Sequence, residues 1–265
     1  AVGGWISHLF QYVIGSLKDV TFEVYALEDV KSADGESEDY YKKDELVATI
    51  TTDDTGIAKI SGLPLGKYYV KEKATVEGFV LDDEAREIDL TYRDQDTAEV
   101  TYSADWQNNR QKAEVQVVKK EKDSDRVLEG AVFALCVKDD ITGADGKVIL
   151  KADTVIEELA TDKEGKLTFT ADLPIDFAYY IKETSPAPGF ATTDETQEFT
   201  FEYGGAEKEK VFYAFTFEDE PTVIEITKTS LTDGKELEGA KLQVTDESGK
   251  VVDSWTSGKE AHIIK

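Results

Sequence analysis

The chain has 265 residues, and its 56 acidic and 30 basic side chains give a formal net charge of −26. This charge excludes nucleic acid and anionic membrane surfaces as partners, because both would repel it, and it is ordinary for a surface-displayed protein. A single cysteine, Cys136, excludes an intrachain disulfide. With His8 and His262 as the only histidines, near opposite ends, zinc sites and histidine-based catalysis are nearly excluded. No apolar run reaches the ~20 residues of a membrane span, and without methionine the chain is expected to be a mature piece or fragment.

An internal repeat with a constant offset organises the chain. Residues 17–24 match residues 128–135, and the run Tyr-Tyr-x-Lys-Glu at 68–72 returns, with the same offset, at 179–183. The beginning of a third copy of the repeat, Leu-Glu-Gly-Ala, lies at 237–240. The sequence therefore predicts one domain over residues 1–110, a second over 111–220, and the truncated start of a third repeat over 221–265.

Within the repeats the apolar residues alternate with a period of two, which is typical of half-buried strands. In chain order, the second repeat shows this pattern over Val115–Lys119, Tyr179–Glu183 and Val211–Asp219, whereas a helical turn at Ala152–Ala160 is only weakly indicated. Short strands between Gly, Asp and Pro turns predict an all-β fold of tandem antiparallel sandwiches, roughly seven strands each. Because the junctions carry no flexible Gly/Ser linker, we expect a stiff rod.

Three charged residues of the second repeat, Lys119, Glu183 and Asp219, share the phase of the apolar side chains on their own strands. Burying three charged groups is costly unless they meet. One interpretation is a buried ion-pair cluster. The other is covalent, because an apolar pocket disfavours charge, so a neutral lysine amine can attack a protonated aspartic acid while the glutamate shuttles the protons. The product would be one amide and one water, formed once, so the chain is not predicted to be an enzyme.

The residues around these positions resemble a known family. The runs at 117–133, 179–190 and 218–222 are similar to repeats of SpaA-type pilins and Cna B-type domains, the prealbumin-like modules of Gram-positive surface proteins. The most specific piece is the E-box, here Tyr179-Tyr-Ile-Lys-Glu183 followed by Pro-Gly-Phe. The resemblance implies prealbumin-like (Ig-like) sandwiches and an isopeptide bond between a first-strand lysine and a last-strand Asn or Asp. Lys119 and Asp219 match the crosslinked positions, and Glu183 matches the assisting glutamate.

The first repeat carries only part of this pattern. Glu72 occupies the E-box position, and the repeat offset places Asn108 at the position that the aspartate has in the second repeat. His8 falls at the lysine position, and residues 1–17 contain no lysine. Lys18 could substitute only if the strand register shifted. We therefore expect a divergent or cropped first strand, no crosslink in this repeat, and a hydrogen bond between Glu72 and Asn108.

The third copy of the repeat has a candidate first strand, in which Ile224, Ile226 and Lys228 alternate with polar residues. It has no E-box and no last strand within the chain, so Lys228 is expected to have neither a crosslinking partner nor an assisting glutamate. This pattern is why the third repeat is predicted to be incomplete.

The resemblance implies a structural stalk module of a pilin or adhesin on the surface or wall of a Gram-positive bacterium, stiffened by the isopeptide bond, with neighbouring domains or pilus subunits as partners. An adhesin region that itself binds a host protein or glycan is the alternative, and it would need an exposed aromatic groove. No cofactor is predicted. The acidic pairs 53–54 and 139–140 lack EF-hand spacing, so no metal is predicted either. Cys136, Trp106 and Trp255 are interpreted as packing residues.

Overall fold

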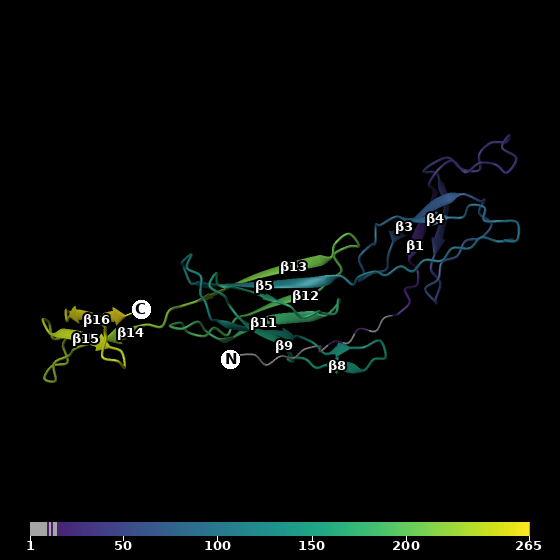
Figure 1. The fold of residues 1–265 in the computed structure, drawn as a ribbon. Helices are drawn as coiled ribbons and strands as arrows, with labels where there is room; N and C mark the ends of the chain where they lie inside the picture. Colours follow the sequence, from purple (N-terminus) through teal and green to yellow (C-terminus); the bar gives the residue numbers. More distant parts are fainter. Residues whose placement is uncertain (1–9, 11, 13–14, 265) are drawn as a thin grey trace.

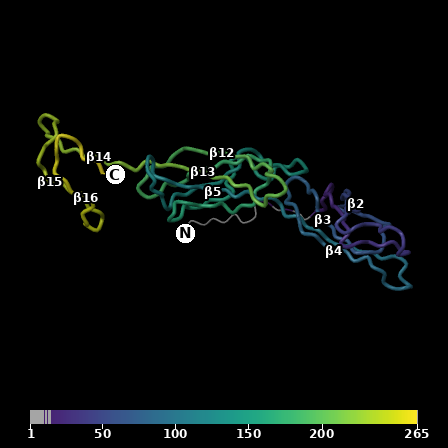
Figure 2. Tube along the Cα trace, turned by 90° about the horizontal axis from the view of Figure 1, so that it is seen from above, coloured from purple at the N-terminus to yellow at the C-terminus, as the bar shows by residue number. Residues whose placement is uncertain are grey.

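The computed structural model describes residues 10, 12 and 15–264, and the regular secondary structure of these residues consists of strands alone. The strands form three units arranged one after another along an elongated molecule (Figures 1 and 2). The weakly indicated helical turn at 152–160 is wrong, because this segment contains the strand β9 (Val155–Ala160), which pairs with β6 (Val132–Val137).

The second unit is a sandwich of two sheets. One sheet has the order β10-β5-β13, and the other has the order β12-β11-β6-β9. The remaining strands of these sheets are β5 (Lys112–Glu121), β10 (Lys166–Phe169), β11 (Ala178–Ser185), β12 (Thr196–Thr200) and β13 (Lys210–Asp219), and a short hairpin adds β7 (Ile141–Thr142) and β8 (Val148–Leu150). The central strand β5 is antiparallel to β10 but parallel to β13, so the predicted antiparallel pattern has one exception.

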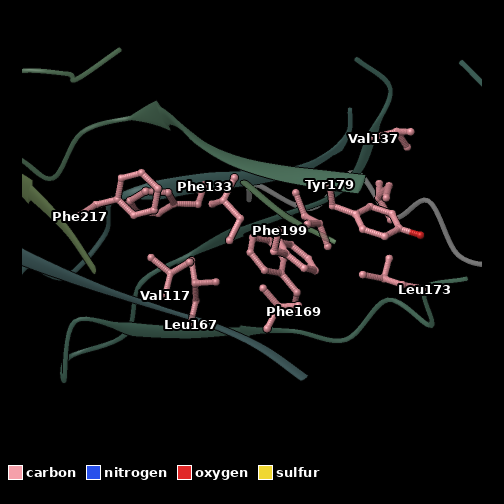
Figure 3. Packing of buried hydrophobic residues seen from close by; sticks show 14 of the residues in the cluster. Val117, Phe133, Val137, Leu167, Phe169, Leu173, Tyr179, Phe199 and Phe217 are labelled. Atoms are coloured by element: carbon pink, nitrogen blue, oxygen red, sulfur yellow. The ribbon is translucent and has the colours of Figure 1, made fainter. Parts of the chain in front are cut away.

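The core of the second unit lies between the two sheets and is rich in aromatic side chains (Figure 3). Phe133 and Phe217 come from opposite sheets, and their ring centroids are 4.9 Å apart. Phe199 contacts Tyr179 at a centroid distance of 5.4 Å and so extends the core toward the far end of the unit. Full burial of such rings supplies much of the stabilisation of a domain of this size.

The first unit has a single four-stranded sheet in the described residues, with the order β2-β1-β3-β4. Its strands are β1 (Thr21–Ala26), β2 (Leu46–Thr51), β3 (Lys67–Ala74) and β4 (Arg86–Asp89). This order repeats the order β9-β6-β11-β12 of the second unit. Residues 52–66 and 90–109, which correspond to β10 and β13, contain no strand. In the second unit, β5 lies between β10 and β13 and pairs with both. The described part of the first unit contains no counterpart of β5, so the segments that correspond to β10 and β13 have no central strand with which to pair. The expectation of roughly seven strands therefore holds for the second unit only.

The C-terminal unit consists of two separate strand pairs. The strand β14 (Ile224–Ile226) pairs with β17 (His262–Ile264), and β15 (Lys241–Thr245) pairs with β16 (Val251–Thr256). Ser257 is the one buried residue among the described residues after 220. Isolated two-stranded pairs are marginally stable in water, so this unit has little cohesion of its own.

In both repeats, an equivalent turn forms a backbone hydrogen bond to the segment that follows the domain. After β3, the carbonyl of Gly78 accepts a hydrogen bond of 2.8 Å from the backbone of Gln111. After β11, the carbonyl of Gly189 accepts a bond of 2.9 Å from the backbone of Thr222, the counterpart of Gln111 one repeat further on. Both glycines have positive φ, at 90° and 88°, a conformation that glycine adopts without strain. The Gly-Phe turn that follows the E-box thus holds the interdomain segment in place by a backbone hydrogen bond in both repeats.

Gln111 is fully buried at the first junction. Its side-chain amide donates to the carbonyls of Gly205 and Lys208 at 3.0 and 2.7 Å, and its amide oxygen accepts from the backbone of Gly204 at 2.7 Å. Tyr203 adds a bond of 2.9 Å from its hydroxyl to the carbonyl of Phe79 in the first unit. Side-chain and backbone bonds therefore join the two units.

We predict that Gln111→Ala loosens this junction, because backbone groups lose their partners at a cost of about 1–3 kcal/mol each. Trypsin should then cleave after Arg110 or Lys112 at least about tenfold faster than in the unaltered chain. The exposed Gln107 provides the matched control as Gln107→Ala. Equal cleavage rates in the two variants would contradict the role given to Gln111.

The described residues near the N-terminus contact the second unit. Phe10 packs against its hydrophobic core, and the Tyr12 hydroxyl donates to the carbonyl of Asp172 at 2.9 Å. The Arg110 guanidinium stacks on the Tyr12 ring, 3.1 Å from its centroid, and forms an ion pair with Asp172. Burial raises the pKa of Tyr12 to about 12. Residues 10 and 12 therefore do not serve as a first strand of the first unit.

Candidate crosslinking site

Two backbone contacts fix the position of Lys119 near the end of β5. Its amide donates to the carbonyl of Gly165 at 2.8 Å, and its carbonyl accepts from Leu128 at 3.0 Å. Gly165 has a φ of +66°, and a Cβ there would lie 2.8 Å from the Lys119 carbonyl oxygen. A side chain at this turn would therefore displace the lysine backbone, which explains the glycine.

Lys119, Glu183 and Asp219 converge in the core of the second unit. The Nζ of Lys119 forms an ion pair with Oδ1 of Asp219 and lies 3.1 Å from Oε1 of Glu183. None of the three side chains has solvent-exposed surface. The surroundings are apolar, since Nζ lies 5.5 Å from the centroid of the Phe133 ring and Phe217 pairs with Lys119 across the sheet. The three charged groups therefore meet in a closed, aromatic-lined pocket.

The surroundings of Glu183 change the pKa of its carboxyl group. Burial is the main cause that raises the pKa of Glu183 above its ordinary value, although the Thr193 amide, which donates to Oε2 at 3.2 Å, and the neighbouring Lys119 act in the opposite direction. Oδ2 of Asp219 is buried and has no hydrogen-bond partner in the described part of the chain. A buried oxygen without a partner is costly, and a reaction that removes it would relieve that cost.

The first unit holds an equivalent pair on the same scaffold. Glu72 is buried, and both of its carboxylate oxygens accept from Nδ2 of Asn108 at 2.8 Å. The same nitrogen also donates to the carbonyl of Val80 at 2.9 Å. The Asp82 amide lies 3.3 Å from Oε2 of Glu72, which matches the Thr193 contact of Glu183 at the equivalent position of the second repeat. The expected hydrogen bond between Glu72 and Asn108 is present.

The described residues bring no lysine to this first pair. Lys18 points instead to Asp54, with Nζ 2.6 Å from Oδ1, and its side chain is 56% exposed. His8, which falls at the lysine position, lies outside the described residues. The first unit therefore presents a glutamate and an amide without an amine in the described structure.

The E-box tyrosines act as anchors, a role that strand alternation alone could not indicate. Tyr68 and Tyr179 donate from their hydroxyls to the carbonyls of Pro64 and Pro174 at 2.6 and 2.8 Å. The leucine-proline turn that precedes each E-box in the sequence is the signal that could have suggested this contact. Thr193 gave no such signal, because its contact with the glutamate depends on the path of a loop.

The other candidate residues take packing roles. Cys136 is buried in β6, and burial raises the pKa of its thiol. Trp106 lies edge-on to Phe22, and Trp255 stacks on His262 with ring centroids 4.1 Å apart. Among the described residues there is no cluster of three or more side chains that could hold a metal ion.

Two tandem β-domains with equivalent glutamate sites define a prealbumin-like module. The family model of the SpaA prealbumin-like fold domain matches residues 14–106 and again residues 113–213. The chain therefore belongs to the SpaA prealbumin-like family, and the predicted family and fold class are confirmed.

Comparison with solved structures gives three relevant neighbours. The Bacillus anthracis TIE protein is 25% identical with a TM-score of 0.56, and the match covers 94% of this chain and 40% of that one. This chain thus spans less than half the length of that protein. The shaft pilin SpaA of Lactobacillus rhamnosus GG is 19% identical with a TM-score of 0.31 and coverages of 78% and 88%. The minor pilin of Streptococcus agalactiae is 18% identical with a TM-score of 0.28 and coverages of 78% and 85%. No curated protein sequence matches this chain.

Membership of this family indicates a structural module of a pilus or of a cell surface. In the described part of the chain, no helix has the length and apolar character needed to cross a membrane.

Proposed function

We propose that this chain is a stalk segment of a surface pilin or adhesin, with domains bounded near residues 110 and 220, and that an isopeptide bond between Lys119 and Asp219 locks its second domain. The observation that carries the proposal is the direct contact of an amine and a carboxyl group inside a closed apolar pocket, with Glu183 beside them. A group pair held in contact reacts at a high effective concentration.

The proposed reaction is balanced within the three side chains. The neutral Nζ of Lys119 attacks Cγ of protonated Asp219, a C–N bond forms, and the bond between Cγ and one carboxyl oxygen breaks. Glu183 accepts a proton from the amine and delivers it to the departing oxygen, which leaves as water. The unpartnered Oδ2 of Asp219 is the oxygen whose departure removes a buried polar atom. No cofactor or metal is required.

The bond would change how the domain carries load. It would join β5 to β13, the first and last strands of the domain, which are parallel neighbours. A pull on the chain ends would pass along β5, through the amide and out at Asp219, so the intervening residues would carry none of it. Lys119 and Asp219 are 100 positions apart in the sequence. Such a load path suits a stalk.

The intact mass of the whole chain tests the bond. We predict a mass lower than the sequence mass by one water, with Lys119 and Asp219 joined in a single proteolytic fragment. Glu183→Gln removes the proton shuttle while keeping the side-chain size, so the mass should return to the sequence value. Glu164→Gln, at an exposed turn position, should keep the water loss and serves as the control. The full sequence mass in the unaltered chain would refute the proposal.

Binding of a host ligand is the alternative function, and it would need an exposed aromatic groove. A pocket in the C-terminal unit is lined by Lys241–Gln243 and Ser254–Thr256 and contains one aromatic side chain, Trp255. Because that ring stacks on His262, it does not offer a free platform. The described residues therefore favour the stalk function.

A further inference from the structure

The strand β13 forms one edge of the sheet β10-β5-β13 in the second unit. It is 10 residues long, whereas the other edge strands of this unit, β10, β12 and β9, have 4, 5 and 6 residues. Its pairing with β5 runs through Lys210–Asp219 without a bulge, and Val211–Phe217 contains no charged residue and no proline. Proteins usually protect a sheet edge with charges, prolines, bulges or a short strand. The middle of β13 has none of these protections.

Alternate residues of β13 direct their backbone groups away from β5. The carbonyls of Glu209 and Asp219, both at odd-numbered positions, accept from backbone amides at or next to the two ends of β5 at 3.0 and 2.9 Å. Because the direction alternates along a strand, the even-numbered residues face outward. The Thr216 carbonyl agrees with this, since it accepts from Nε2 of Gln197 at 2.7 Å. Among the described residues this is the one hydrogen bond to the outward backbone groups, so the rest of the row is open to a further strand.

The side chains of these even-numbered residues form an exposed stripe with a charge only at each end. Phe212 is 70% exposed, which is unusual for a phenylalanine. Lys210 begins the stripe and Glu218 ends it, so the two ends have opposite sign. Lys210 forms an ion pair with Glu114 at 2.7 Å, but its side chain remains 51% exposed. In order, the stripe consists of Lys210, Phe212, Ala214, Thr216 and Glu218.

A second copy of this edge is complementary to the first when the two strands are antiparallel. A two-fold axis through Ala214, perpendicular to the sheet, places Ala214 opposite its own copy and Phe212 opposite Thr216. It also places Lys210 opposite Glu218 at both ends, and opposite charges on facing strands attract. Outward backbone groups then meet outward backbone groups, and both cores lie on the same side of the joined sheet. A parallel pair of the same edges would turn the core of one copy to the other side.

We propose that two copies of this chain join through their β13 edges in antiparallel orientation, so that one sheet continues from β10 of one copy to β10 of the other. The strand β13 lies along the long axis of the elongated chain, and two joined copies therefore point in opposite directions (Figure 1). For stalks anchored at one end, this geometry connects facing surfaces. That last step rests on the stalk function proposed above, whereas the pairing of the edges does not.

Sedimentation equilibrium of the whole chain tests the pairing at 0.15 M salt, where a screening length of about 8 Å limits repulsion between the two acidic copies. We expect a reversible dimer. Lys210→Glu and Glu218→Lys should each weaken it about tenfold or more, because two like-charge pairs replace two attractive pairs. An equal mixture of these two variants should recover the dimer, because both pairs then have opposite charges. Lys166→Glu, at an exposed position of β10, makes the same charge change away from the edge and should have no effect.

Disulfide trapping tests the register. Under mild oxidation Ala214→Cys should link two copies, whereas Phe212→Cys should link efficiently only when mixed with Thr216→Cys. Ala214→Pro removes one outward N–H that makes no bond to β5, so it should abolish the dimer and leave the fold intact, as circular dichroism can verify. A folded chain that stays monomeric, a dimer unchanged by Ala214→Pro, or an edge that pairs with an extended peptide but not with a second copy would overturn the proposal.

Beads that carry the chain by its C-terminal end test the connection of facing surfaces. Beads with the unaltered chain should cluster, and beads with Lys210→Glu should cluster only when mixed with beads that carry Glu218→Lys. Beads that stay dispersed although the free chain forms dimers would overturn the antiparallel direction. The water loss at Lys119 and Asp219 is measured by mass on the same samples, so a failure of the pairing is distinguished from a failure of the intramolecular bond.

Discussion

Under force applied at its two ends, the unaltered chain should keep the second domain folded, whereas Glu183→Gln should let it extend by roughly 330 Å more, because an extended chain spans about 3.3–3.6 Å per residue. The amide would shield the residues between Lys119 and Asp219, which are 100 positions apart, and the variant would release this whole segment. Single-molecule pulling measures the release directly as a length step.

The first unit provides an internal reference in the same molecule. It should release its own length in both chains, because none of the described lysines reaches Glu72 and Asn108. Glu164→Gln should behave like the unaltered chain. If the unaltered chain and Glu183→Gln gave the same length steps, an ion pair rather than an amide would hold the pocket together, and the stalk would have no mechanical lock.

The candidate site could be predicted because strand geometry fixes the direction of side chains. Alternation places Lys119, Glu183 and Asp219 in the phase of the apolar residues, and successive side chains of a strand point to opposite faces. The repeat offset then located Glu72 and Asn108 on an equivalent scaffold. What alternation cannot give is the pairing of strands, so the parallel neighbours β5 and β13 were not foreseen.

The parts that escaped prediction depend on contacts distant in the sequence. Gln111 precedes β5 and looks like an ordinary boundary residue, yet the carbonyls that it binds are 94 and 97 positions away. Residues 99–108 alternate like β13, with Trp106 and Asn108 in phase. They nevertheless form no strand, because β13 pairs with the central strand β5, which has no counterpart in the described part of the first unit. The local sequence pattern predicts on which face of a strand a side chain lies, whereas the formation of the strand depends on a neighbouring strand with which it pairs.

The first domain should melt well below the second and be cut first by protease. Its core is small, with seven buried apolar residues between Val20 and Val70, and its described part has one sheet instead of two. In the chain-entropy account, a crosslink across a 100-residue span adds about 5 kcal/mol to the second domain. One kcal/mol shifts the melting temperature of such a domain by about 4–8 °C, so the two transitions should differ by about 20 °C or more.

Calorimetry should resolve two transitions, and mass spectrometry should find the early cuts within residues 52–66 and 90–109, where the described backbone has no strand partners. Adding Glu183→Gln should lower the upper transition and leave the lower one in place, because only the second domain loses its crosslink. A single transition in the unaltered chain, or early cuts confined to residues 120–218, would show that the crosslink does not govern the order of unfolding.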